Sequence, residues 1–311
     1  NDILFDESLC EQGRNFCNKI WNCFRLIKGF EVADIAAPKG NQLAVEWFDA
    51  LLAQTEKEII DLFSKYRLSE ALMAVYKLYT DEFSGWYLEM IKPAYGQPID
   101  KQTYEQSLAF FDRLLKLLHP FMPFITEELW QNLYERKEGE SIMVSPLETS
   151  LPFREESEVG SSIIEQMETL KQIVSGVRNI RAGKNIPQKE LLSLYFENAN
   201  NYPLAELLTK LANVEMGEKN ENSGATSTFI VGTTEYAVPM DKFIDVEEEL
   251  KKLEADLKYN EGFLQSVLKK LSNEKFVSKA PANVIEMERK KQADAESKIA
   301  SLKESIAALK K

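Results

Sequence analysis

The sequence predicts a mainly α-helical protein, in which a helical bundle is followed by a small α+β module and an antiparallel two-helix coiled coil. Three observations support this prediction. Residues 1–150 contain long apolar stretches at helical spacing, and residues 151–244 also contain short strand-like runs. Residues 245–311 carry a heptad pattern. We therefore expect three domains with these boundaries: 1–150, 151–244 and 245–311.

The first domain reads as a bundle because its apolar stretches are separated by short helix-breaking segments. Gly29 follows the first stretch, Gly40 precedes the second, and Pro93 follows the third. His119 and Pro120 separate the last two stretches, and Pro123 suits the first turn of a new helix. The expected helices cover 8–28, 41–65, 68–91, 101–118 and 121–137.

The second domain mixes helical and strand patterns. A helix is expected at 160–182, a strand at 191–196 and a further helix at 203–211. The runs 229–231 and 236–238 flank Gly232 and Thr233, which predicts a β-hairpin.

The third domain has apolar residues at alternating steps of three and four, which is typical of a coiled coil. Pro281, between the two halves of the pattern, cannot continue a helix, so we expect two helices that fold back on each other. Among the seam positions of the first helix, Asn260 is the only polar residue. The predicted seam is Leu250, Leu253, Leu257, Asn260, Leu264, Val267 and Leu271, facing Ile285, Glu288, Gln292, Ala295, Ile299, Leu302, Ile306 and Leu309.

Composition indicates an ordinary cytoplasmic protein without a membrane segment. No apolar run approaches the roughly 18 residues that a membrane span needs. Cys10, Cys17 and Cys23 form an odd cluster without paired Cys-x-x-Cys spacing, which favours reduced thiols over disulfides. We expect no metal site, because the only histidine, His119, is distant from these cysteines.

The net charge of −12 argues against a general polyanion binder. The charge is distributed unevenly, with −9 in 1–150, −4 in 151–244 and +1 in 245–311. The final segment is therefore the least acidic part of the chain.

No catalytic constellation is recognisable. The phosphate-binding and nucleotide-binding glycine motifs and the nucleophile-elbow motif are absent from the sequence. A nucleophile–histidine pair would have to use His119, which lies between apolar residues and reads as a packed helix end. Paired carboxylates such as Glu127 and Glu128 suit a solvated first turn of a helix. The sequence thus favours binding over chemistry.

The first predicted helix contains a local positive island. No acid occurs between Gln12 and Phe30. Amides and cations beside Trp21 suit RNA bases, which proteins read by hydrogen bonding and stacking. The alternative is that Trp21 is a core residue and that the polar groups pair with neighbouring acids. The candidate RNA-binding residues here are Arg14, Asn15, Asn18, Lys19, Asn22, Arg25 and Leu26.

Two further groups of cations are candidates. Residues 176–189 hold no acid, and their Arg178, Arg181 and Lys184 could meet phosphates. Equally, they could be favourable cations at a helix C-terminus before a Gly–Pro stop. The tip of the predicted coiled coil carries Lys269, Lys270, Lys275 and Lys279, which suit solvation or a contact point.

Several of these segments resemble valyl-tRNA synthetases, which are class I aminoacyl-tRNA synthetases. The resemblance covers nearly the whole chain, and its most specific part is the turn at 271–277 with Ala280 and Pro281. Residues 14–22 resemble the opening helix of the anticodon-binding domain of that family. The other matching segments are 86–89 with 92–93, the motif at 119–130, and 177–181 with 185–187.

The sequence departs from the family at three places. The family usually has an Asp–Arg pair where Val45 and Glu46 precede Trp47. It often has an aromatic residue, which packs against an anticodon base, where this chain has Leu26. It often has Glu–Met at 183–184, so this chain is locally more basic.

The resemblance implies that the bundle reads the anticodon and that the coiled coil grips the outer corner of tRNA(Val). It implies a fragment, because the catalytic and editing domains of the family would precede Asn1. ATP and Mg²⁺ are expected for that catalytic domain, and no cofactor is expected here. The expected partners are tRNA(Val) and the N-terminal domains of the same enzyme, in a monomer. The alternative is a coiled-coil protein-interaction scaffold without an RNA role.

Overall fold

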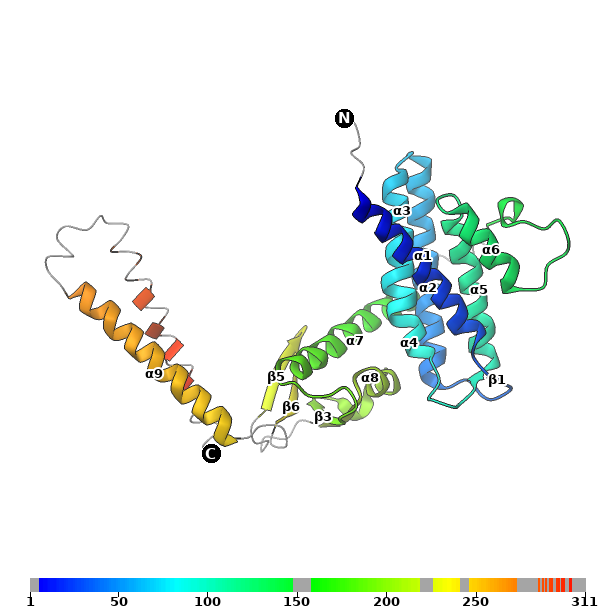
Figure 1. Ribbon diagram of the computed structural model, residues 1–311. Helices are drawn as coiled ribbons and strands as arrows, with labels where there is room; N and C mark the ends of the chain where they lie inside the picture. Colours follow the sequence, from blue (N-terminus) through cyan, green and yellow to red (C-terminus); the bar gives the residue numbers. More distant parts are fainter. Residues whose placement is uncertain are drawn as a thin grey trace. The chain divides into compact units, whose positions relative to one another are not determined.

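The computed structural model describes residues 6–147, 158–218, 226–240 and 246–272, together with scattered positions between 285 and 303 (Figure 1). The chain divides into two compact units. The first consists of Asn1–Ser175 with Asn201–Asn213, and the second of Gly176–Asn200 with Val214–Lys311. The mainly α-helical fold with a small α+β module is confirmed, whereas the expected domain boundaries stay predictions.

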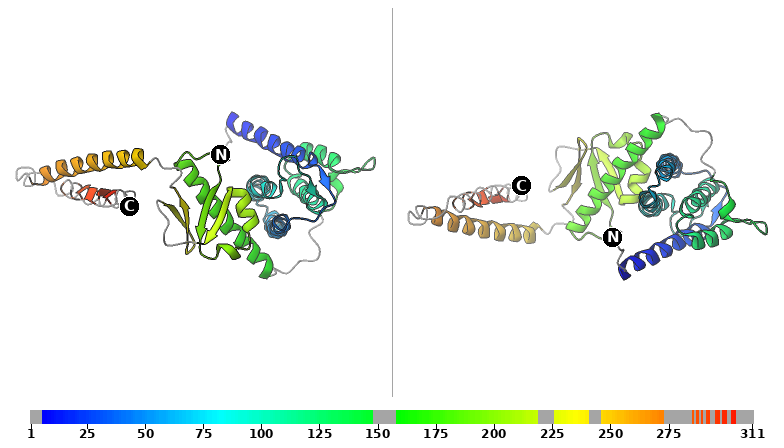
Figure 2. Two further views of the ribbon diagram at one scale, coloured as in Figure 1. Left: turned by 90° about the horizontal axis from the view of Figure 1, so that it is seen from below. Right: turned by 90° about the horizontal axis from the view of Figure 1, so that it is seen from above.

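The first unit is built around the predicted bundle, and several of its helices are seen end-on in Figure 2. Pro123 is the first residue of its helix, as predicted, and that helix ends earlier than predicted, at Leu133. The helices are α1 (Glu7–Lys28), α2 (Lys39–Ser64), α3 (Leu68–Lys77), α4 (Leu88–Ile91), α5 (Lys101–Leu118) and α6 (Pro123–Leu133), followed by the short 3₁₀ turn η2 (Ile142–Val144).

The helix predicted at 68–91 is interrupted by a π-helix. The segment η1 (Leu78–Tyr87) joins α3 to α4 and buries Tyr79, Phe83 and Tyr87. A π-helix bonds each N–H to the carbonyl five residues earlier, and its occurrence is typical of functional sites. The buried residues Tyr79, Phe83 and Tyr87 lie at steps of four, which an α-helix also allows, so the sequence pattern did not reveal the π-helix.

Aromatic side chains form the core of the bundle. The rings of Phe48 and Tyr87 are 5.0 Å apart, and those of Phe48 and Phe110 are 5.1 Å apart. Phe83 stacks on Tyr87 at 5.5 Å. Burying each large apolar side chain contributes about 1.5–3 kcal/mol, so this cluster stabilises the position of η1 against α2 and α5.

Short polar connections fix the ends of the bundle helices. The two-residue strands β1 (Val32–Ala33) and β2 (Ile99–Asp100) pair in parallel. The buried Asp100 carboxylate accepts hydrogen bonds from Thr103 N at 2.8 Å and from Asn41 Nδ2 at 3.0 Å. His119 ends α5, and its Nδ1 lies 2.7 Å from Thr126 Oγ1. The histidine therefore takes part in a local helix-end contact, as the sequence indicated.

The helix α7 (Glu158–Gly183) begins in the first unit and ends in the second. In the first unit its Lys171 is buried and donates to Glu82 on η1, with 2.7 Å between Nζ and Oε2. The same ammonium group lies 5.2 Å from the ring centre of Trp47. The helix α8 (Ala205–Ala212) also belongs to the first unit.

The second unit contains a four-stranded sheet in the order β4-β3-β6-β5. Its strands are β3 (Leu192–Phe196), β4 (Val214–Glu218), β5 (Thr226–Val231) and β6 (Thr234–Pro239). β3 and β4 are parallel, whereas β6 is antiparallel to both β3 and β5. The predicted hairpin is β5–β6, and Gly232 in its turn has a φ of 60°. β4 was not predicted.

The segment from residue 245 onward, which we call the arm, belongs to the second unit and contains α9 (Val246–Leu271). Among the described side chains of α9, the predicted seam positions Leu257, Asn260, Leu264, Val267 and Leu271 are buried or half-buried. The scattered positions between 285 and 303 are helical, and Ala295 and Ile299 among them are buried. An ion pair of 3.0 Å joins Lys303 Nζ to Glu261 Oε1. These contacts agree with the predicted helical hairpin.

Candidate nucleic-acid interface

A hollow of about 320 Å³ lies between α1 and the segment formed by η1 and α4. We call it the α1 hollow. Five of the seven candidate residues on the first predicted helix line it, whereas Arg14 and Arg25 do not. Its lining residues are Asn15, Asn18, Lys19, Asn22, Cys23 and Leu26 on one side and Ser84, Leu88 and Glu89 on the other.

The helical phase of α1 explains why these residues gather in one place. Phe16, Ile20, Cys23 and Ile27 are the buried residues of the helix, and they lie at steps of three and four. Their packing against the bundle leaves the adjacent face, which carries the three asparagines, exposed beside η1. The sequence therefore predicted one wall of the α1 hollow, and tertiary packing supplies the other.

Lys19 joins the two walls. Its Nζ donates to the carbonyl oxygen of Thr80 on η1 at 3.0 Å, while the side chain stays half-buried. The ammonium group carries three donors, so two remain for a ligand or water. This contact holds a positive charge at the edge of the α1 hollow.

Three amides face the α1 hollow with their hydrogen-bonding capacity unused. Asn15, Asn18 and Asn22 are exposed, and within the described part of the chain their side chains make no hydrogen bond. Each amide offers two donors and one acceptor oxygen. Glu89 adds a carboxylate on the opposite wall, with Lys92 Nζ 3.8 Å away. The site thus presents donors and acceptors together.

The inner wall of the α1 hollow is less polar. Cys23 is buried, and burial raises the pKa of its thiol despite contacts with Ser84 and Tyr79. Because the thiolate is the reactive form of cysteine, this thiol is not activated as a nucleophile. Leu26 and Leu88 provide apolar surface on opposite walls. Polar groups at the rim and apolar groups inside are typical of ligand pockets.

Trp21 is not a core residue, so that part of the alternative interpretation is wrong. Its side chain is 41% exposed, and its ring lies 6.3 Å from that of Phe24. Arg14 approaches Glu11 at 4.0 Å on the surface, which is a weak exposed ion pair. Arg25 is exposed near the end of the same helix.

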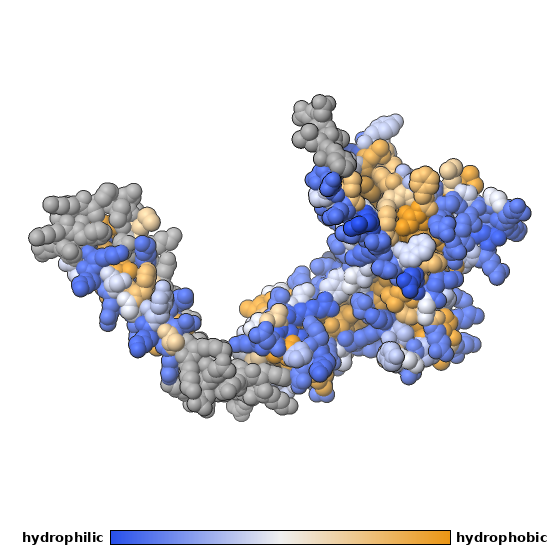
Figure 3. Space-filling model, in the orientation of Figure 1, coloured by the Kyte–Doolittle hydropathy of each residue, from blue (hydrophilic) through white to orange (hydrophobic). Residues whose placement is uncertain are grey.

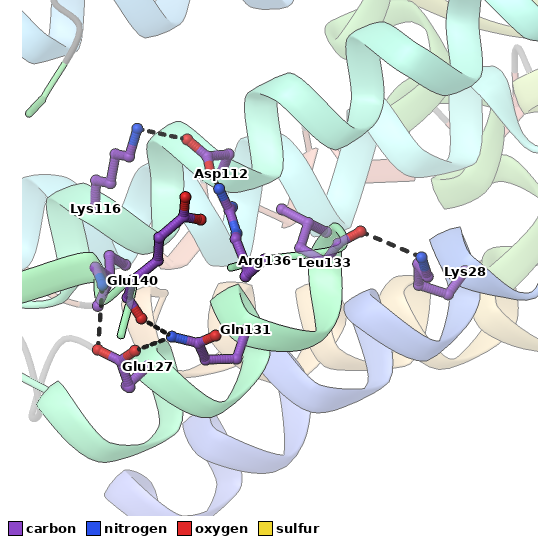
Figure 4. Close-up of polar contacts among 9 residues, drawn as sticks. Lys28, Asp112, Lys116, Glu127, Gln131, Leu133, Arg136 and Glu140 are labelled. Carbon is purple, nitrogen blue, oxygen red and sulfur yellow. Dashed lines mark hydrogen bonds and ion pairs between the residues drawn. The ribbon is translucent and has the colours of Figure 1, made fainter. Parts of the chain in front are cut away.

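A second polar cluster, shown in Figure 4, lies where α1 meets the end of α6. Lys28 Nζ donates to the carbonyl oxygen of Leu133 at 3.2 Å. The guanidinium of Arg136 lies 3.4 Å from the ring centre of Trp130 and 3.3 Å from Asp112 Oδ1. Asp112 also pairs with Lys116 at 2.8 Å. Sequence reasoning missed Arg136, because its stacking partner becomes apparent only in the folded chain.

Glu127 organises the turn beyond this cluster. Its carboxylate accepts from Gln131 Nε2 and Ser141 Oγ at 2.7 Å and from Ile142 N at 3.2 Å. Partial burial raises its pKa, but these hydrogen bonds outweigh burial and lower the pKa below the ordinary value of 4.5. In its charged form, Glu127 therefore stabilises the turn at η2.

The candidates on residues 176–189 differ in their surroundings. Arg178 and Lys184 are exposed, whereas Arg181 is only 1% exposed and donates from Nη1 to the carbonyl oxygen of Pro187 at 2.9 Å. Burial lowers the pKa of this guanidinium, although Glu190 acts in the opposite direction. For Arg181 the geometry favours the structural alternative, a cation that closes the end of α7.

The candidate lysines of the arm are partly described. Lys269 and Lys270 are exposed in the last turn of α9. Lys275 and Lys279 lie outside the described residues. Lysines at a helix C-terminus are favourable because of the negative end of the helix dipole, so the position alone does not separate solvation from RNA contact.

Two other features are absent from the described ranges. No group of three or more His, Cys, Asp or Glu side chains could hold a metal ion there. In the same ranges, no helix is both long enough and apolar enough to cross a membrane. The three cysteines are free thiols.

Comparison with known proteins assigns two parts of this architecture to one class. Residues 45–196 match the anticodon-binding domain of tRNA ligases, and residues 245–310 match the tRNA-binding arm of valyl-tRNA synthetases. The bundle helices within residues 45–196, followed by the arm, therefore define an aminoacyl-tRNA synthetase segment, and α1 precedes the matched residues.

Comparison with individual relatives identifies the family within this class. The valine–tRNA ligase of Phocaeicola vulgatus is 67% identical and that of Bacteroides thetaiotaomicron 60%, each over 100% of this chain and 35% of the relative. That of Fusobacterium nucleatum is 34% identical over 98% of this chain and 36% of the relative. The chain belongs to the valyl-tRNA synthetase family, as the resemblance predicted, and spans about a third of the length of these relatives. The scaffold alternative gains no support.

Proposed function

We propose that this chain is the tRNA-binding, C-terminal part of a cytoplasmic, monomeric valine–tRNA ligase. The bundle contacts the anticodon of tRNA(Val), and the arm contacts the outer corner of the folded tRNA. The whole enzyme joins valine to tRNA(Val) at the expense of ATP. The catalytic part, for which ATP and Mg²⁺ are proposed, and the editing part are the intramolecular partners of this chain.

The α1 hollow is the observation that supports contact between the bundle and the anticodon. Its volume of about 320 Å³ is at the lower end of the range of roughly 300–1,000 Å³ that is typical of ligand pockets. This size suits one splayed base better than a duplex. Proteins read single-stranded RNA loops through hydrogen bonds to base edges and through stacking. The three unbonded asparagine amides and Lys19 supply the hydrogen-bonding groups.

The overall charge is compatible with this proposal because most of the acidic residues lie away from the α1 hollow, where Glu89 is the only acid among the lining residues. The first 150 residues have a balance of −9, yet α1 holds no acid beyond Glu11. Acidic surface elsewhere disfavours unspecific binding of nucleic acid. Lys19, Arg25 and Lys28 instead offer local positive charge along one helix.

Binding of tRNA(Val) to the purified 311-residue chain tests the proposal. We expect binding at low salt that weakens as salt rises, because phosphate contacts release counterions. Deleting the chain from the full-length enzyme should reduce charging with valine. Absence of tRNA binding at low salt, together with unchanged charging by the truncated enzyme, contradicts the proposal.

The scaffold alternative predicts a different result in the same preparation. A coiled coil that serves protein docking would associate with other copies or partners through residues 246–310. An intramolecular hairpin keeps the chain monomeric at all concentrations. Sedimentation of the chain at increasing dilution, with and without tRNA, separates the two possibilities.

A further inference from the structure

The helix α8 contacts the ends of two bundle helices within the first unit (Figure 1). Glu206 Oε2 accepts a hydrogen bond from Gly40 N, at the start of α2, at 2.8 Å. One turn later, Lys210 Nζ donates to the carbonyl oxygen of Met90, in the last turn of α4. A single helical face of α8 therefore places an acid at one helix N-terminus and a base at another helix C-terminus.

The Glu206 contact replaces a missing cap. α2 follows Pro38, which makes no side-chain cap, so the first N–H groups of the helix lack partners of their own. A carboxylate at this end is also favoured by the helix dipole. The approach is close, because a Cβ on Gly40 would lie 3.1 Å from Glu206 Cδ and 3.3 Å from Leu207 Cδ2.

The contact of Lys210 likewise supplies a hydrogen-bond partner that a helix end lacks. α4 has only four residues, and Pro93 follows its end. Pro93 lacks an N–H and cannot satisfy the carbonyl of Met90 by a tightened last turn. Burial lowers the pKa of the Lys210 ammonium, whereas the carboxylates of Glu206 and Glu89 act in the opposite direction. Lys210 thus lies within the electrostatic reach of Glu89, which lines the α1 hollow.

We infer that Lys210 is a positioning residue for the α1 hollow, acting through the end of α4 that carries Leu88 and Glu89. Leu88, Met90 and Ile91 are buried, so α4 is held in place as one packed turn at the end of η1. Holding the carbonyl of Met90 fixes the direction of Glu89 relative to the asparagine amides on α1. The inference rests on the proposed function of the α1 hollow as a base-binding site.

The experiment compares Lys210→Met, which keeps the apolar stem, with Lys210→Arg, which keeps a charged donor. Lys65→Met is the matched control, since Lys65 forms only an exposed pair with Asp61. Binding is measured for tRNA(Val) and for the same tRNA with a replaced anticodon. We expect Lys210→Met to lower the preference for the intact anticodon about tenfold, the equivalent of one good base contact. Lys210→Arg and Lys65→Met retain the preference.

Combining Lys210→Met with Glu89→Gln distinguishes positioning from general loosening. If Lys210 acts through Glu89, the second substitution adds little to the first, because coupled residues are not additive. Additive losses, or an unchanged preference in Lys210→Met, overturn the inference. If Lys210→Met does not fold, the same comparison is made with Lys210→Gln, and full preference in that folded variant likewise overturns the inference. Absence of tRNA binding by the wild-type chain instead refutes the proposed function.

Discussion

The ammonium nitrogen of Lys19 lies 3.0 Å from the carbonyl oxygen of Thr80, and this contact ties α1 to the π-helical segment η1. The lysine is thereby ordered before any ligand arrives, so binding loses less side-chain entropy. The contact also keeps the two walls of the α1 hollow at a fixed separation.

Replacing Lys19 by Met should weaken binding of tRNA(Val). If the ammonium meets a phosphate, the slope of log affinity against log salt falls by about 1. The lost hydrogen bond to Thr80 should cost only about 0.5–1.5 kcal/mol of stability. Filter binding at several salt concentrations and urea unfolding measure the two effects. An unchanged affinity and slope would remove Lys19 from the interface.

Replacing Asn22 by Ala should reduce tRNA binding without reducing stability. Its amide has no hydrogen-bond partner within the described residues, so the free energy of unfolding should change by less than about 0.5 kcal/mol. A lost base contact costs about 1–3 kcal/mol of discrimination. The control is Gln54→Ala, an exposed amide on α2. Equal binding by both variants would contradict a role for Asn22.

Replacing Glu56 by Ala should destabilise the bundle strongly. Glu56 is buried and its Oε2 lies 2.7 Å from Arg113 Nη2. Removing one partner of a buried ion pair costs about 3–5 kcal/mol. Asp61→Ala is the control, because its pair with Lys65 is exposed and worth at most about 1 kcal/mol. Chemical unfolding of both variants measures the difference, and similar losses would show that burial does not strengthen the Glu56 pair.

Acid should loosen the turn held by Glu127. Its folded-state pKa is below the unfolded value of 4.5, so the charged form stabilises the fold above 4.5. This contribution is lost as the pH falls from 4.5 through the folded-state pKa. The protection of the Ile142 amide against hydrogen exchange, relative to an unfolded chain at the same pH, measures the effect when it is compared between about pH 7 and pH 3. Glu127→Gln should show little of this pH dependence; an identical profile in both proteins would exclude Glu127 as its source.

Replacing Gly176 by Ala should strain the second unit. A Cβ at Gly176 would lie 2.3 Å from Cε2 of Phe229, which stacks on Tyr236. Overpacking of this kind costs about 1–3 kcal/mol. Gly183→Ala is the matched control in the same helix, since no atom would lie within 4 Å of its Cβ. Thermal unfolding should show a loss for Gly176→Ala that Phe229→Leu partly restores, and a neutral result would indicate that Phe229 moves freely.

The coiled-coil seam was predictable because heptad spacing depends only on positions along one helix. Leu257, Leu264 and Val267 are less exposed than most of their neighbours, as the pattern required. The strand β4 was not predictable, because the alternation of Val214, Glu215 and Met216 is too short to mark a strand and is followed by Gly217 and Glu218. Pairing with β3 supplies its stability instead.

The candidate site was predictable on one wall only. The absence of acids between Gln12 and Phe30 marked this stretch of α1, and helical phase then grouped Asn15, Lys19 and Asn22. Ser84 and Glu89 could not be found in this way, because nothing local in their sequence indicates that η1 folds against α1. Figure 3, coloured by hydropathy, likewise shows apolar and polar side chains intermixed on the face of the bundle that is in view, so hydropathy does not mark a site on that face.

The most direct test of the account measures how the anticodon affects binding. The 311-residue chain is titrated with tRNA(Val) and with the same tRNA carrying a replaced anticodon, and both titrations are repeated with the double variant Asn18→Ala and Lys19→Met. The account predicts at least about tenfold tighter binding of the intact tRNA, and loss of that difference in the double variant. Equal binding of the two tRNAs by the unmodified chain, or a difference that survives in the double variant, would contradict it.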